Sequence, residues 1–228
     1  MATAIDEAQG AAAAPSPARP PVLRVPFTKA GLVPSGHFDV NVWAPAVNTH
    51  TLLDEHGHGA VPVSEARFLW GGGDLYVFFY AADVDLQVKA TQHDGPVWKD
   101  DGAVLEFPSP GERKFVIDVS PTGVVADAIC PLDAADVGDA RCDLQWESGA
   151  RVGTDYDGTI NTLGDFDEEW AVEMAVPLAS IAVRPPFAGA QIPFSLFRCE
   201  VAHDGKRACG SWGRQPGQPG TLVLAPQT

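Results

Sequence analysis

Apolar and polar residues alternate with a period of two along much of this chain, and that spacing is typical of β-strands with one buried face. Between residues 168 and 178 the apolar side chains from Trp170 to Val176 occupy every second position. Residues 36–46 show the same alternation, beginning at Phe38. Because neighbouring side chains on a strand point to opposite faces, each of these segments predicts a strand with one face in the core.

The clearest supersecondary signal is a β-hairpin over residues 61–88, where two β-rich runs flank the turn sequence GGGD at 71–74. Further strands are predicted at 21–27, 36–46, 103–107, 114–119, 123–129, 143–146, 149–153, 158–162, 168–178, 191–202 and 220–226. Turn signals recur about every 8 to 12 residues, and no segment has the pattern of a long helix. The chain is therefore predicted to be all-β, an antiparallel β-sandwich of jelly-roll or immunoglobulin-like type with little helix.

The amino-acid composition agrees with an all-β fold and makes some classes of binding partner improbable. The 23 glycines and 20 prolines suit many short strands joined by turns, and 228 residues are enough for one such domain. The formal net charge of −15 repels phosphate backbones and anionic lipid heads. No run of 18 apolar residues occurs, so no transmembrane segment is predicted. The acidic surplus fits neutral polyols or bound cations such as calcium.

The first residues differ in composition from the rest. Residues 1–21 read as a flexible Ala/Pro-rich tether, which leaves residues 22–228 as a single domain. The opening lacks the pattern of a signal peptide as written. A tail of this kind often follows a removed signal or lipid anchor, which predicts an extracytoplasmic protein tethered to a cell surface or to a larger enzyme. A cytoplasmic protein with a disordered N-terminus is the alternative.

The four cysteines indicate in which cellular compartment the protein acts. Cys130 and Cys142 form one local pair, and Cys199 and Cys209 form another, each flanking turn sequence. Three pairings are formally possible, and two local disulfides are preferred over four reduced thiols. Disulfides would place the protein outside the cytoplasm.

Seven segments occur in an order that resembles a known family. They are DLYVFFYAADVD (74–85), VWKDDGAVLEF (97–107), KFVIDVSPTGVVADA (114–128), EEWAVEMAVPLASI (168–181), FRCE (197–200), SWGR (211–214) and GTLVL (220–224). The series is similar to the family 9 carbohydrate-binding modules and their relatives in the DOMON-like β-sandwich superfamily, over about residues 36–226. The resemblance implies a β-sandwich that binds a mono- or oligosaccharide.

The resemblance also implies a site. Two tryptophans of the family commonly hold a sugar between them, and Trp98 and Trp212 match those positions. Glu106 resembles the carboxylate on the following strand, and Arg198 a guanidinium near the sugar. Trp146 either contacts the sugar at the rim of the site or is simply half-buried. From apolar strand patterns, we expect the other tryptophans to be core residues. They are Trp43, Trp70 and Trp170.

Metal sites are suggested by acids in loops and by one histidine cluster. The family often carries structural calcium, and Asp83, Asp85 and Asp101 are the candidate ligands, with solvated loops as the alternative. His56 and His58 with Asp54 could ligate zinc or iron, or lie in a mobile loop. No heme is expected, because the relevant relatives use methionine and Met174 lies in a core-like strand pattern.

The sequence contains none of the common catalytic motifs, such as G-x-S-x-G or H-E-x-x-H. The leading hypothesis is a monomeric, non-catalytic carbohydrate-binding module. A small-molecule enzyme that uses Glu106 or the His56/His58 cluster is the alternative from another class. A heme-carrying electron-transfer domain is the third.

Overall fold

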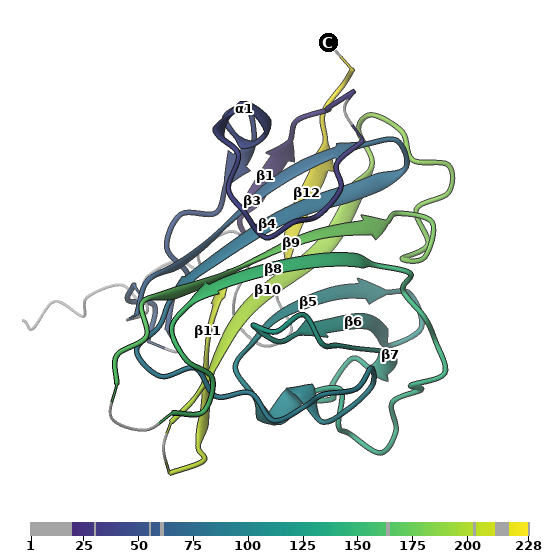
Figure 1. Cartoon of the computed structure of the whole chain (residues 1–228). Helices are drawn as coiled ribbons and strands as arrows, with labels where there is room; N and C mark the ends of the chain where they lie inside the picture. The colour runs from purple at the N-terminus through teal and green to yellow at the C-terminus, as the bar shows by residue number, and fades with distance from the viewer. Residues whose placement is uncertain are drawn as a thin grey trace, which may run out of the picture.

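The computed structural model describes residues 20–29, 31–54, 56–59, 62–162, 165–202, 204–212 and 219–227. These residues form two β-sheets packed face to face, which Figure 1 shows as two layers. The strands pair antiparallel except at β1, which runs parallel to β12. The fold is therefore all-β, as predicted. Most of the predicted tether, residues 1–19, lies outside the described residues.

The larger sheet, called sheet 1 here, has seven strands in the order β1-β12-β10-β5-β6-β7, with β11 paired to β10 beyond the end of β12. Its strands are β1 (Val22–Val25), β5 (Gly102–Ser109), β6 (Arg113–Val119), β7 (Val125–Pro131), β10 (Gln191–Val201), β11 (Arg207–Trp212) and β12 (Gly220–Leu224). β7 is the edge strand at the end of sheet 1 opposite β1.

The smaller sheet, called sheet 2 here, has the order β2-β3-β4-β9-β8. Its strands are β2 (Val47–Asn48), β3 (Ser64–Gly71), β4 (Asp74–Ala82), β8 (Arg151–Asp157) and β9 (Glu169–Pro177). β3 and β4 form the predicted hairpin. The described residues also contain two short helices, α1 (Val40–Trp43) and a 3-10 turn, η1 (Val97–Lys99).

The main core lies between the two sheets and is filled by the alternate side chains that the period-two pattern selects. On β9 these include Trp170, Val172, Met174 and Val176, each at most 1% exposed. Trp70 is also buried in this core, so two of the predicted core tryptophans are confirmed there. Burial of aromatic and branched side chains from both sheets supplies most of the driving force for folding.

Three secondary-structure predictions are wrong. Residues 36–46 contain α1 in place of a strand, because the side chain of Asp39 caps the helix by accepting from the amide of Asn41. The segments 143–146 and 158–162 contain no strand of their own. β11 was missed, because its sequence shows no apolar alternation.

Both local disulfides are present. Cys130 bonds to Cys142, and Cys199 bonds to Cys209 on the neighbouring strand. Among the described residues, no helix has the length and apolar character needed to cross a membrane.

Candidate functional site

The two tryptophans expected to hold a sugar together lie on opposite faces of sheet 1. Trp212 is 9% exposed and faces the main core, where its ring lies 6.0 Å from that of Phe194. Trp98, in η1, packs instead on the outer face of sheet 1, against a second apolar cluster that includes Val104 and Val116. The prediction that these indoles face one another is therefore wrong, because the side chain of Trp212 is used to fill the core.

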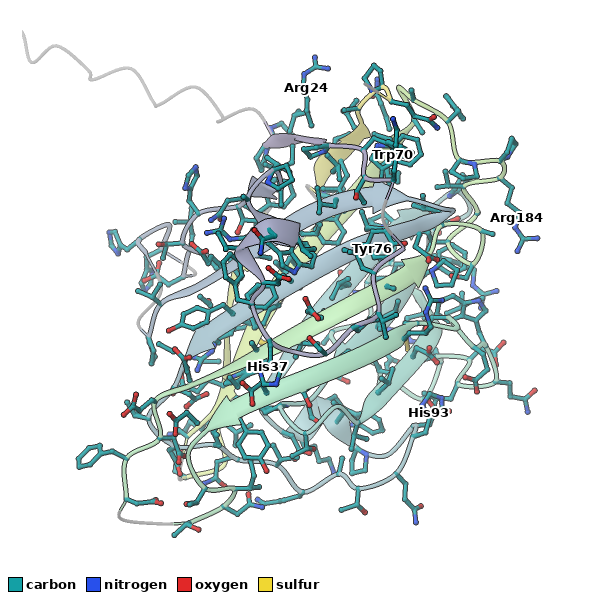
Figure 2. All side chains as sticks on the ribbon, turned by 45° about the horizontal axis from the view of Figure 1, so that its top comes forward. Arg24, His37, Trp70, Tyr76, His93 and Arg184 are labelled. Carbon is teal, nitrogen blue, oxygen red and sulfur yellow. A yellow bond between two sulfur atoms is a disulfide. The ribbon has the colours of Figure 1, made fainter. Side chains whose placement is uncertain are left out.

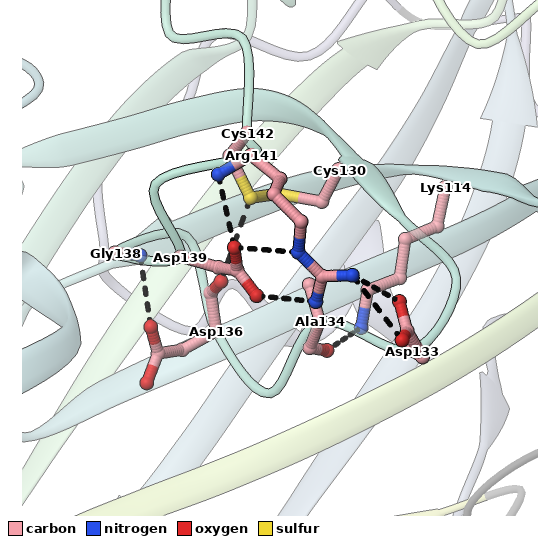
Figure 3. A network of polar contacts seen from close by, with 9 residues as sticks. All are labelled: Lys114, Cys130, Asp133, Ala134, Asp136, Gly138, Asp139, Arg141 and Cys142. Atoms are coloured by element: carbon pink, nitrogen blue, oxygen red, sulfur yellow. Dashed lines mark hydrogen bonds and ion pairs between the residues drawn. A yellow bond between two sulfur atoms is a disulfide. The ribbon is translucent and has the colours of Figure 1, made fainter.

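A loop from residue 131 to residue 144 covers much of that outer face. Arg141 holds its shape by donating to Asp139 at 2.7 Å and to Asp133 at 3.1 Å, as Figure 3 shows, and the disulfide to Cys142 closes it. Hydrogen bonds from Arg141 lower the pKa of Asp139 to about 2. Gly138 lies directly on the indole of Trp98, where an added Cβ would come within 2.2 Å of Nε1. Only part of the Trp98 ring is accessible to a ligand.

Glu106 lies on the same outer face but is engaged by a lysine. Lys114 Nζ donates to Glu106 Oε1 at 2.5 Å and to the carbonyl of Ala134 at 2.7 Å. The Glu106 side chain is 14% exposed and that of Lys114 is 4% exposed. Burial raises the pKa of Glu106, and the ammonium of Lys114 opposes that shift. Contact with a ligand is restricted to the small exposed part of this carboxylate.

Arg198 is part of a buried ion pair and does not reach the surface. Its Nη2 donates to Asp83 Oδ2 at 2.9 Å, and both side chains are at most 4% exposed. The indole of Trp170 donates to the same oxygen at 3.1 Å. The expected ligand role of Arg198 is thus replaced by a structural one. Trp146 is half-buried, with its ring 5.1 Å from that of Phe115.

The three predicted calcium ligands do not fit calcium as they are arranged. Both oxygens of Asp83 accept from protein donors, since Oδ1 accepts the amides of Val84 and Asp85. Asp101 accepts the amides of Gln87 and Val201, one on each oxygen. Burial raises the pKa of Asp101 to about 7. Asp85 accepts from the side chain of Gln87. Calcium needs several oxygens that are free to converge on it.

A change at Asp118 is expected to alter how stability depends on pH. Burial raises the pKa of this carboxyl to about 6 from 3.8, although Arg207 Nη2 lies 3.2 Å from Oδ2. The folded protein keeps this proton in a pH range where the unfolded chain has lost it. The free energy of unfolding therefore falls as the pH rises from 3.8 to about 6, by roughly 1.4 kcal/mol per unit of pKa shift.

Urea denaturation of the wild type and of Asp118→Asn, at about pH 4 and about pH 7, measures this contribution. Over that interval the wild type should lose about 2.4 kcal/mol more than the variant, since pH 4 is already slightly above the unfolded pKa of 3.8. Equal losses in the two proteins would contradict the assignment of a protonated Asp118.

Among the described residues, Asp54, His56 and His58 do not bring three metal-ligand atoms close together, and Met174 lies in the core. The Asp54 carboxylate accepts the backbone amides of His56 and His58, which lowers its pKa. Nδ1 of His58 lies 3.7 Å from it, and the two imidazole rings lie 6.3 Å apart. Met174 is buried in the main core at 1% exposure.

The outer face of sheet 2 carries a groove of about 380 Å³ that the sequence did not reveal. Its floor is formed by β3, β4 and β9, and one wall by the chain at residues 36–38. The lining residues are Gly36, His37, Phe38, Val63, Glu65, Arg67, Phe78, Tyr80, Asp155, Glu169 and Ala171. We call this the outer groove. Its volume is within the range of about 300–1,000 Å³ that is usual for small-ligand sites.

Glu173 holds the wall of the outer groove in place. From β9 its Oε1 accepts the indole N–H of Trp43 at 2.7 Å, and its Oε2 accepts the amides of Ser35 and Gly36 at 2.6 and 3.2 Å. Gly36 has a φ of +87°, and a Cβ there would lie 2.2 Å from the backbone of β8. Glycine at this position allows the segment to lie directly on the sheet.

The outer groove combines an exposed aromatic ring with paired polar groups. Phe38 is 47% exposed and packs edge-on against Phe78 at 5.1 Å, with the guanidinium of Arg67 over its ring at 5.2 Å. Tyr80 Oη donates to Glu169 at 2.7 Å. Burial, together with that carboxylate, raises the pKa of Tyr80 to about 12, so its hydroxyl stays protonated and remains a donor.

The rim of the outer groove is charged and open to solvent. His37 Nδ1 lies 2.9 Å from Asp155 Oδ2, and their side chains are 73% and 54% exposed. Glu65 accepts from Arg67 at 3.2 Å. Figure 2 shows His37 on the side of the molecule that carries the broad strands of sheet 2. Such groups offer acceptors and donors around an apolar surface, an arrangement suited to a neutral polyol.

Comparison with known proteins shows the same fold in carbohydrate-binding proteins. A candidate carbohydrate-binding protein from Bacteroides uniformis ATCC 8492 superposes with a TM-score of 0.63 at 14% identity, covering 90% of this chain and 99% of that one. A family 9 carbohydrate-binding module from Caldicellulosiruptor kristjanssonii in complex with cellotriose gives a TM-score of 0.59 at 14% identity, covering 91% and 95%.

The same module in complex with glucose gives a TM-score of 0.59 at 14% identity, covering 91% of this chain and 97% of that one. The chain has the fold of the family 9 modules. It matches no protein-family model and no curated protein.

Proposed function

We propose that this protein is a non-catalytic carbohydrate-binding module that binds sugar in the outer groove. The observation that carries the proposal is the exposed ring of Phe38 at the wall of a groove rimmed by carboxylates and a guanidinium. Proteins of the same fold have been solved with cellotriose and with glucose, which supports sugars as the ligand class.

The chemistry of a pyranose matches this lining. Its flat faces carry C–H bonds that stack on an aromatic ring, while its hydroxyls project from the rim. Stacking contributes about 0.5–1.5 kcal/mol beyond the buried area. Glu65 and Asp155 can accept hydrogen bonds from hydroxyls, and Arg67 can donate to them. Charge-assisted hydrogen bonds of this kind contribute about 1.5–3 kcal/mol each. The sum predicts affinity around micromolar, which is about −8 kcal/mol.

Substitution in the outer groove should weaken sugar binding. Phe38→Ala removes the stacking surface, and Glu65→Gln replaces a charged acceptor with a neutral one. We expect each variant to bind cellotriose at least about tenfold more weakly than the wild type, as about 1.4 kcal/mol corresponds to tenfold. Calorimetric titration with glucose and cellotriose measures the change.

Trp98→Ala is the matched control, because it removes a partly accessible aromatic ring from the outer face of the other sheet. Its affinity for cellotriose should equal that of the wild type. Circular dichroism and melting temperature confirm that each variant is folded. If Trp98→Ala loses binding while Phe38→Ala and Glu65→Gln keep it, the sugar binds over Glu106 and the location proposed here is wrong.

We infer that the protein acts outside the cytoplasm as a monomer, tethered by its N-terminal tail to a cell surface or a larger enzyme. Two disulfides support an oxidising compartment. Isolation from a cytosolic fraction with four free thiols would contradict this inference.

A further inference from the structure

Four potential metal ligands meet at the outer edge of β7, away from the outer groove. His93 Nε2 lies 3.0 Å from Glu147 Oε2, 3.7 Å from Asp94 Oδ1 and 3.9 Å from Asp127 Oδ1. The ligand atoms of His93, Asp94 and Glu147 all lie within 4.8 Å of one another. Figure 2 shows His93 at the side of the molecule, well separated from His37. Residues far apart in the sequence thus form one cluster, which we call the β7-edge cluster.

Backbone hydrogen bonds hold the β7-edge cluster together. The Asp94 amide donates to the carbonyl of Val125 at 2.9 Å, and the Asp127 amide donates to Asp94 Oδ1 at 3.3 Å. From the other side, the Ser148 amide donates to Asp127 Oδ2 at 2.9 Å. Asp127 therefore holds both the loop that carries His93 and the loop that carries Glu147. The fold itself brings these two residues together.

Asp127 provides a second, independent observation that points to a ligand. Its side chain is 2% exposed, and Oδ1 has no hydrogen-bond partner within the described part of the chain, although Oδ2 is satisfied. Buried polar atoms in native proteins nearly always have a partner. Here the unpaired oxygen faces His93 Nε2 among two further carboxylates, an environment that favours a bound cation.

We propose that the β7-edge cluster binds one divalent transition-metal cation of the zinc type, with His93, Asp94, Asp127 and Glu147 as ligands. An imidazole nitrogen in the set favours zinc over calcium, which takes oxygen ligands. Zinc–ligand bonds of about 2.0–2.1 Å place tetrahedral ligand atoms about 3.3 Å apart. The three distances from His93 Nε2 to the carboxylate oxygens span that value.

The bound cation would join the loop at residues 92–95 and the segment at residues 146–148 to the edge strand. Because the unfolded chain holds no such site, binding stabilises the folded state. The cluster lies on the edge of sheet 1, so its role is structural and separate from sugar binding in the outer groove.

Calorimetric titration of the full chain with Zn²⁺, after treatment with EDTA, tests the proposal. We expect one equivalent to bind and the melting temperature to rise. His93→Ala and Glu147→Gln, both at exposed positions, should each weaken Zn²⁺ binding at least about tenfold. Ca²⁺ at the same concentration should give no comparable shift in melting temperature.

His58→Ala is the matched control, since His58 also lies in a loop beside an aspartate, at 3.7 Å from Asp54. It should bind Zn²⁺ as tightly as the wild type. The proposal is overturned if the wild type shows no stoichiometric binding. It is also overturned if His93→Ala and Glu147→Gln bind as tightly as the wild type, or if only His58→Ala loses the metal.

Discussion

Arg198→Met should lower the free energy of unfolding by about 3–5 kcal/mol, because it leaves the carboxylate of Asp83 buried without its counter-charge. The two side chains are 4% and 0% exposed, and the remaining donor to Asp83 Oδ2 is the indole of Trp170 at 3.1 Å. Burial of an ionised carboxylate without a paired cation is costly. Urea denaturation at neutral pH measures the loss.

Arg151→Met is the matched control for this experiment. Arg151 also pairs with an aspartate, Asp74 at 2.6 Å, but its side chain is 55% exposed. Exposed pairs of this kind typically contribute at most about 1 kcal/mol. Sugar affinity should be unchanged in Arg198→Met, since the residue does not line the outer groove. Equal losses of stability in the two variants would show that the buried pair is not the structural element described here.

Replacing Cys130 and Cys142 together by alanine should cost about 3 kcal/mol of stability, by the chain-entropy argument for closing a loop of this size. The bond spans 12 residues and closes the loop that lies over Trp98. The loop is then held by the contacts of Arg141 and by a few backbone hydrogen bonds, such as the one from the Asp143 amide to the Ile129 carbonyl. Its amides should therefore exchange with solvent faster than in the wild type.

Replacing Cys199 and Cys209 by alanine provides the comparison for that experiment. This bridge joins opposed residues of β10 and β11. Its loss should lower global stability without specifically exposing the loop at residues 131–144. Hydrogen exchange read residue by residue separates the two cases. Unchanged protection of that loop after removal of Cys130 and Cys142 would contradict its dependence on the disulfide.

Much of the fold could be predicted from the sequence, because one buried face per strand leaves a period-two pattern. The β3–β4 hairpin and β9 were found in this way, although residues 75–79 of β4 and 172–176 of β9 are buried on both faces. The pattern fails at residues 36–46, where a capping aspartate and a contact from Trp43 to Glu173 favour a helix over a strand. It also fails at β11, whose pairing with β10 is set by tertiary contacts.

The candidate site was harder to predict than the fold. The alternating pattern shows that side chains on a strand point to two opposite faces. It does not show whether a given tryptophan lies on the core face or on the face that meets a ligand. Trp212 is predicted as a ligand contact from its place in the motif order of the similar family, although it fills the core.

The outer groove depends on a contact that no local pattern encodes. Glu173 binds the amides of Ser35 and Gly36 across more than 130 residues of sequence. Charged residues at outward positions of β3, such as Glu65 and Arg67, were the one signal in the sequence that could have indicated it. The β7-edge cluster is likewise assembled from residues 93–94, 127 and 147 by folding.

A crystal structure of the protein soaked with cellotriose tests the central claim most directly. The account predicts sugar density in the outer groove, with a pyranose ring against Phe38 and its hydroxyls within hydrogen-bonding distance of Glu65, Arg67 or Asp155. Density over Trp98 and Glu106 on the other sheet, with an empty outer groove, would contradict it.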